Sequence, residues 1–257
     1  MGNIMAIFGK EMRSYFGSPI AYVMAGVFLL FTGFVFRNQV LEFHDMSVFL
    51  KFAEYEEKSR LNVNEVVVES FFEFQTFVWM IVIPMLTMRL YAEEKRGGTY
   101  ELLMTSPITS GQILIGKFLA CYVLYALIEF LAFGYLGILA MYARIDWGPV
   151  YSGVLAVLLL GGTFISVGIL ASSLTENQII AAVLSFFMLI LLWMIDWAAR
   201  YAGDIFYVVL KFLSLVEHTR DMIQGVVDTH DIVFFLSATL FFLFVTHNVL
   251  ESRRWRA

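Results

Sequence analysis

Six long apolar stretches alternate with shorter segments that carry most of the charged residues. A membrane-spanning helix needs about 20 predominantly apolar residues, and each stretch approaches or exceeds that length. The candidate spans are residues 19–36, 71–91, 113–141, 150–174, 178–195 and 232–250. The third and fourth are long enough to tilt or protrude, and Pro84 is expected to kink the second. The pattern predicts an all-α polytopic membrane protein with six spans and a single domain, residues 1–257.

The composition agrees with this prediction. The 257 residues are 60% hydrophobic and 15% charged, whereas soluble domains are about 25% charged. Cys121 is the only cysteine, which excludes an internal disulfide. The histidines are scattered without ligand spacing, so we expect no metal site. We also expect no nucleic-acid partner. These histidines are His44, His218, His230 and His247.

The distribution of charge gives the orientation. If the N-terminus is cytoplasmic, the cytoplasmic segments hold more basic than acidic residues, and the opposite side holds the reverse. Basic residues favour the cytoplasmic side of a membrane, and the tail "ESRRWRA", residues 251–257, is the clearest example. An even number of spans then places both termini in the cytoplasm.

The segment "NIMAIFGKEMRSYF" before the first span is amphipathic, and it does not resemble a cleavable signal peptide. One face carries apolar residues at helical spacing, namely Met1, Met5, Phe8, Met12 and Tyr15. The other face carries Asn3, Lys10, Arg13 and Ser14. We expect an interfacial helix whose basic residues face lipid phosphates. The alternative is an extension of the first span that faces water.

The stretch "GQILIGKF", residues 111–118, matches the phosphate-binding pattern G-x-x-x-x-G-K. A working loop of this kind follows a strand and has Ser or Thr after the lysine, but Phe118 stands at that position. Thr109 and Gln112 have capping-box spacing, which predicts that a helix starts directly after Thr109. We therefore expect no ATPase site, no catalytic residue and no cofactor in this chain. Lys117 is expected to mark the level of the cytoplasmic lipid phosphates.

The segment "RLYAEEKRGGTYELLMTSPITSGQ" lies between the second and third spans. The second span should continue as a helix through Arg96 until the two following glycines break it. A short helix, "TYELLMT", should follow, with Glu101 near its positive N-terminal end, and Pro107 should end it. Such a helix, lying across two spans, could pack on its own bundle or lipid, or it could bind a cytoplasmic partner.

Three segments carry a family resemblance: "FGKEMRSYFGSPIAYVMAGVFLL", "RLYAEEKRGGTYELLMTSPIT" and "SLVEHTRDMIQGVVDTHDIVFF". They resemble, in order, segments of ABC-2 type transporter permeases of the GldF/NosY-like branch. The resemblance implies that the loop after the second span is a coupling helix that contacts a separate ATPase subunit. The matching positions are Glu93, Glu94, Lys95, Arg96, Gly98, Thr99, Glu101 and Leu102. It implies a second contact at Thr175 and Glu176, where Thr175 and Gln178 have capping-box spacing.

The same resemblance implies the function and the partners. It implies a permease subunit of an ATP-driven transporter in a bacterial cytoplasmic (inner) membrane. The partners would be two ATPase subunits that hold ATP and Mg²⁺, a second permease copy or close paralogue, and membrane lipids. Relatives serve gliding motility, copper-site maturation and polymer export, so the substrate stays open. An alternative is a subunit that transmits motion to an extracytoplasmic partner without transport, and the acidic loop 37–70 could touch that partner.

Two carboxylates fall within predicted spans, Glu73 near an outer end and Glu129 deep in the third span. A carboxylate at a helix centre costs about 2.5–3.5 kcal/mol on insertion scales. Both are candidates for a pathway or gating role, or, less well supported, for an intramembrane enzyme. Otherwise Glu129 could lock helices together through Tyr122, Tyr125 or Tyr135, and Glu73 could be solvated at the outer edge.

Two further features concern packing. Small residues recur four apart in the fourth span, at Gly162/Ser166 and Gly168/Ser172, which permits close helix contact. We expect this contact inside one bundle rather than between copies. The segment 196–231 has an apolar middle too short to span, so we expect it to dip into the outer leaflet or pack over the helices.

Overall fold

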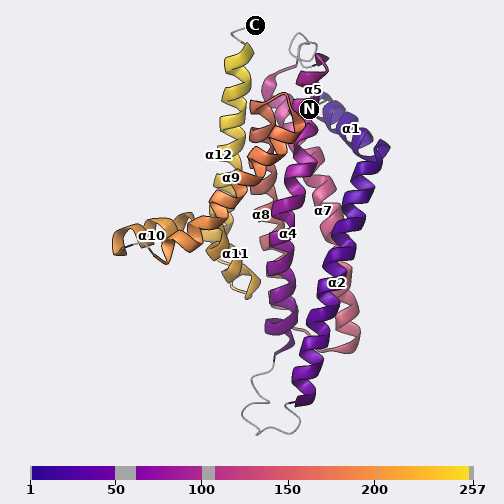
Figure 1. Ribbon diagram of the computed structural model, residues 1–257, viewed down its shortest axis with the longest axis vertical. Coiled ribbons are helices and arrows are strands. Elements are labelled where there is room, and N and C mark those ends of the chain that lie inside the picture. The colour runs from indigo at the N-terminus through magenta and orange to yellow at the C-terminus, as the bar shows by residue number, and fades with distance from the viewer. Residues whose placement is uncertain (1, 50–61, 100–107, 202, 255–257) are drawn as a thin grey trace.

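The computed structural model describes residues 2–49, 62–99, 108–201 and 203–254, and it is a bundle of helices (Figure 1). No described residue forms a strand. Six helical segments are long and apolar enough to cross a membrane, as predicted. They are α2 (Pro19–Phe49), the segment Asn64–Arg96, α7 (Ser110–Tyr142), α8 (Trp147–Leu174), α9 (Gln178–Ala199) and α12 (Thr229–Arg254). The segment Asn64–Arg96 consists of a π-helix (Asn64–Glu69), α4 (Ser70–Thr87) and α5 (Arg89–Arg96).

The helices extend beyond the predicted apolar runs. The helix α2 continues to Phe49, and the second span begins with helix at Asn64, so much of the expected outer loop 37–70 is helical where it is described. Val40 and Phe43 pack against the core and continue the helical spacing of Phe36. The prediction ended the span where charges began, but this apolar face extends the helix further.

The core of the molecule is built around α8. In the most apolar stretch of α8, 78% of the residues are buried, against 17% in α9 and in α12. Close packing depends on small residues, because a Cβ at Gly161 would collide with the Tyr125 ring and one at Gly168 with the Thr87 side chain. The small residues of α8 therefore serve contacts inside one bundle, as expected.

The predicted N-terminal helix is present as α1 (Gly2–Gly17), and its buried face matches the predicted apolar face in part, since Phe8 and Met12 pack against the core. Ile7, Glu11 and Tyr15 are buried, whereas Met5 is 63% exposed. The helix packs along α7, where a Cβ at Gly116 would lie 2.8 Å from the Ile7 side chain. The phosphate-loop-like glycine is thus a helix-packing position, and the contact with α7 buries Ile7 and Glu11, which were not part of the predicted apolar face.

Two shorter helices, α10 (Asp204–Leu213) and α11 (Leu215–Ile223), connect α9 to α12. Figure 1 shows α10 projecting away from the bundle and α11 returning along it. The side chains of Leu215, Met222 and Ile223 are buried, and α11 packs on α8. The prediction that this segment packs over the helices is confirmed for α11.

Candidate functional site

The joint between α4 and α5 is held by a serine from α8. The helix α4 continues through Pro84, where a kink was expected, and a one-residue break at Met88 separates α4 from α5. The hydroxyl of Ser172 accepts the backbone N–H groups of Tyr91 (3.1 Å) and Ala92 (3.2 Å) and donates to the carbonyl of Met88 (2.8 Å). One side chain therefore satisfies backbone groups at the break and ties α5 to α8.

A group of four charges, buried except for Lys10, joins α5 to α1 and α7. The ammonium of Lys117 lies 3.0 Å from a Glu11 carboxylate oxygen and 2.9 Å from one of Glu94. Lys10 lies 2.8 Å from the same Glu94 oxygen and 3.7 Å from Glu11. We call Lys10, Glu11, Glu94 and Lys117 the charge cluster. The placement of Lys117 at the lipid phosphates was wrong, because its side chain is 1% exposed and faces protein carboxylates.

The buried cation of the charge cluster has three close oxygen partners within the chain. Lys117 donates hydrogen bonds to Glu11 at 3.0 Å and to the carbonyl of Leu90 at 2.6 Å, and its third close partner, Glu94, forms an ion pair at 2.9 Å. A buried charge is costly unless it is paired and fully hydrogen-bonded. For Lys10, burial lowers the pKa, but the hydrogen bond and charge of Glu94, with Glu11, outweigh it and raise the pKa overall.

The turn after α5 contains the predicted glycine break. The N–H of Gly97 donates to the carbonyl of Glu93 (2.9 Å), and that of Gly98 donates to the carbonyl of Lys95 (3.2 Å). Gly98 has a φ of 68°, a left-handed conformation that favours glycine. The hydroxyl of Thr99 then donates to the carbonyl of Glu94 (3.3 Å). The rest of the predicted short helix, including Glu101 and Leu102, lies outside the described residues.

The predicted coupling residues divide into two groups. Glu94 and Lys95 face inward, toward the charge cluster and toward the carbonyl of Ser173 in α8, to which Lys95 donates. The exposed members are Glu93, Arg96, Gly98 and Thr99. Among the coupling residues that the structure describes, the exposed group alone is available to a partner. The inward group binds α5 to its own bundle.

The second predicted contact, the connection from α8 to α9, lies beside α5. Lys95 donates to the carbonyl of Ser173, next to the start of this connection, and α5 packs against both α8 and α9. Glu176 is exposed and Thr175 half-buried. The predicted capping box of Thr175 was wrong: Asn177 caps α9 by accepting the N–H of Ile179 at 2.9 Å, and Thr175 accepts the N–H of Asn177 instead. By contrast, the capping box of Thr109 and Gln112 is confirmed.

The deep carboxylate Glu129 is bonded within the protein. It is 2% exposed and accepts the indole N–H of Trp79 from α4 at 2.8 Å. The proposed tyrosine partners were wrong, since Tyr125 donates to the carbonyl of Val157 and Tyr135 to that of Leu29. This arrangement favours the interpretation that Glu129 locks α7 to α4.

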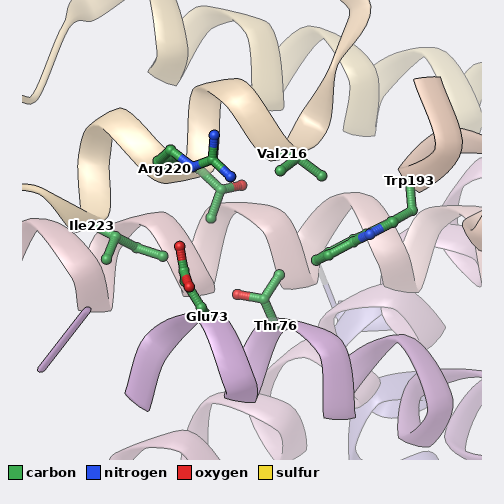
Figure 2. Close-up of a pocket in the computed structure, with 7 residues that line it drawn as sticks. Glu73, Thr76, Trp193, Val216, Arg220 and Ile223 are labelled. Carbon is green, nitrogen blue, oxygen red and sulfur yellow. The ribbon is translucent and has the colours of Figure 1, made fainter. Parts of the chain in front are cut away.

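Glu73 occupies a different environment. It is exposed and lines a cavity of about 270 Å³ between α4, α9 and α11. Figure 2 shows its carboxylate pointing from α4 toward α11, which carries Arg220 and Ile223, while Trp193 closes the far side. Of the two pathway candidates, Glu73 alone faces open space.

Sequence reasoning missed the charge cluster and Ser172. A signal was present, because Glu11 shares a helical face with Ile7 and Tyr15, and Lys117 lies on an apolar helix. A charge on an apolar face requires a partner. The histidines were also not all scattered, since the rings of His218 and His230 lie 5.1 Å apart.

Comparison with known proteins agrees with this architecture. The family model described as "ABC-2 family transporter protein" matches residues 5–230. No curated protein matches the chain. Members of this family are membrane components that work with an ABC ATPase and are typically not catalytic themselves. The chain therefore belongs to the ABC-2 transporter family, as a multi-pass membrane permease component of an ABC transporter.

Proposed function

We propose that this chain converts ATPase-driven motion of a cytoplasmic subunit into movement of its own membrane helices, and that this movement drives substrate export or translocation. The observation that carries the proposal is the attachment of α5. The C-terminal end of α5 leads into an exposed turn, and the rest of α5 is bound to α1, α7 and α8.

The mechanism follows from these attachments. A force on the exposed turn at Gly98 and Thr99 acts directly on the end of α5. Glu94 passes the displacement to α1 and α7 through the charge cluster, and Ser172 with Lys95 passes it to α8. Because packed helices move as discrete rigid bodies, a small shift of the turn becomes a shift of several spans.

The partners follow from the same arrangement and from the family. We propose two ATPase subunits, which hold ATP and Mg²⁺ and contact Glu93, Arg96, Thr99 and Glu176. A second permease copy or close paralogue would complete the pathway in a bacterial cytoplasmic membrane. The start of α1, the helix α5 and the end of α12 lie at one end of the bundle (Figure 1), which supports two cytoplasmic termini.

We propose that the chain belongs to the GldF/NosY-like branch of the family, which the segments quoted above resemble. The same connection of α5 to the spans would also suit an assembly that transports nothing and transmits force to an extracytoplasmic partner. ATPase activity that rises when a substrate is added distinguishes transport from this alternative, and Glu73, which faces the cavity, is our candidate for a residue that a substrate meets.

Photo-crosslinking in native membranes tests the contact. We would introduce a photoreactive residue at Thr99, and at Tyr142 as a matched control, because Tyr142 is 87% exposed at the other end of α7 from the turn. We expect an adduct with an ABC ATPase subunit from position 99 and none from position 142. Absence of the adduct at 99, with the ATPase subunit present in the same membranes, would refute the proposal.

A further inference from the structure

Three side chains with metal-binding groups meet where α11 packs on the start of α12. The ligand atoms of His218, His230 and Asp231 all lie within 4.8 Å of one another. His218 and Asp231 are 5% and 4% exposed, and the His230 side chain is 51% exposed. The group is thus buried on one side and open on the other.

The contacts of His218 leave one of its ring nitrogens facing a carboxylate oxygen of Asp231. Its Nε2 is 3.0 Å from the carbonyl oxygen of Phe212, and since a carbonyl only accepts, Nε2 carries the hydrogen. Its Nδ1 lies 2.6 Å from Oδ1 of Asp231. Nδ1 of the neutral ring and a carboxylate oxygen are both acceptors, so either a proton or a metal ion must stand between them.

The surroundings favour a metal ion. A histidine that binds a metal generally donates its other ring N–H to a carbonyl or carboxylate, as His218 does to Phe212. The ring of His218 is also held in place by stacking on Phe234, with centroids 4.1 Å apart. The histidine is therefore oriented in the way that a metal ligand requires.

The adjoining cavity has an excess of carboxylates. It measures about 380 Å³, and its acidic lining residues are Glu217, Asp221, Asp228 and Asp231. Among the described lining residues Lys211 is the one fixed cation, and it is bound to Glu217 at 2.7 Å. The remaining carboxylates give the cavity a negative potential that attracts cations.

We propose that His218, His230 and Asp231 bind a divalent transition-metal ion of the zinc class. Two imidazoles and one carboxylate suit Zn²⁺, whereas Mg²⁺ and Ca²⁺ prefer oxygen ligands alone. Two ligands about 2.0–2.1 Å from a tetrahedral Zn²⁺ lie about 3.3 Å apart, so binding widens the gap between His218 and Asp231. The ion replaces the proton between them, which is released to solvent.

Such an ion would fasten the connecting helices to the last span. His218 belongs to α11, and His230 and Asp231 begin α12. With three protein ligands, at least one coordination position remains for water or another ligand from the cavity. This inference is independent of the coupling proposal, since the charge cluster and α5 play no part in it.

Metal binding by the purified full chain in lipid nanodiscs tests the proposal. After chelator treatment, the protein is dialysed against Zn²⁺ in the presence of excess Mg²⁺, and bound zinc is measured by mass spectrometry. We expect one Zn²⁺ per chain, a higher melting temperature with Zn²⁺, and, with Co²⁺ as a substitute, the visible absorption of a tetrahedral ion.

His230→Ala is the decisive variant, because its exposed side chain can be removed with little risk to folding. It should weaken zinc binding by about tenfold or more, since even outer-shell changes cost that much, and abolish the cobalt absorption. His44→Ala, an exposed histidine on α2, should bind as the wild type does. Wild-type protein that binds no Zn²⁺, or binds it equally well after His230→Ala, would show that the pair holds only a proton.

Discussion

Two largely buried polar groups fasten helices in this protein, and they differ in their balance of charge. In the charge cluster, two lysines face two glutamates, and the buried Lys117 has three oxygens of the chain within 3.0 Å of its ammonium. Where α11 meets α12, an imidazole nitrogen faces a carboxylate oxygen beside an acidic cavity. In the first group the charges balance within the chain, although one buried carboxylate oxygen of Glu94 has no hydrogen-bond partner, and the group holds α5 to α1 and α7. The second is completed by a cation.

The largest expected effect comes from removing the central cation of the charge cluster. Lys117→Met leaves Glu11 and Glu94 without their buried partner, and it should lower the free energy of unfolding by about 3–5 kcal/mol. The measurement is denaturant unfolding in detergent micelles. Adding Glu11→Gln and Glu94→Gln to the same chain should restore much of the loss, since no uncompensated charge then remains buried.

Lys10→Met is the matched control within the cluster. Its side chain is 57% exposed, so the loss should stay below about 1 kcal/mol. The raised pKa of Lys10 means that its small contribution is present below the unfolded-state pKa and is lost as the pH rises through the higher folded-state value. Equal losses for Lys10→Met and Lys117→Met would contradict the distinction between the buried and the exposed cation.

Ser172→Ala should have an intermediate effect. It leaves the N–H groups of Tyr91 and Ala92 without their acceptor, which should cost about 1–3 kcal/mol. Ser173→Ala is the control, because that hydroxyl donates only to the carbonyl of Leu170 and the carbonyl used by Lys95 is retained. Thermal melting of both variants checks the difference, and indistinguishable values would argue against a special role for Ser172 at the joint.

Gly98→Pro should uncouple the ATPase with little effect on the stability of the bundle. Proline fixes φ near −65°, which is incompatible with the value of 68° at this position, and the N–H to Lys95 is lost. We expect normal membrane insertion and loss of regulated ATPase activity in the assembled complex. Gly134→Ala, where a Cβ meets nothing within 4 Å, should leave that activity unchanged.

The smallest effect is expected from Glu129→Gln. Glu129→Gln retains an oxygen that accepts the indole N–H of Trp79, so stability and transport should change little. Glu129→Leu leaves that N–H unsatisfied, at a cost of about 1–3 kcal/mol. If Glu129→Gln abolished transport while the protein remained as stable as the wild type, the carboxylate would have a pathway role instead of a packing role.

The sequence was sufficient for features that depend on neighbouring residues. Apolar run length identified all six spans, and the glycines after Arg96 correctly marked the end of α5. The predicted ends of the helices were less accurate. Val40 extends α2 beyond the apolar run, and Asn177 caps α9 in place of Thr175, because tertiary packing and competing caps decide such ends.

Features that join distant segments could not be predicted in the same way. Glu11 and Lys117 are 106 positions apart, so their pairing depends on how α1 packs along α7. The pairing of Glu129 with Trp79 depends likewise on the contact of α7 with α4. Residues such as Glu101 and Leu102 lie outside the described part, and their coupling role stays a prediction from the family resemblance.

The most direct test of the central claim is chemical labelling of the turn after α5. Because Cys121 is the only cysteine and is buried, Thr99→Cys gives a single accessible thiol. A membrane-impermeant maleimide should label it in inverted membrane vesicles and not in intact cells, and the bound ATPase subunit should protect it. Labelling from outside the cell, or equal labelling with and without the ATPase subunit, would contradict the account.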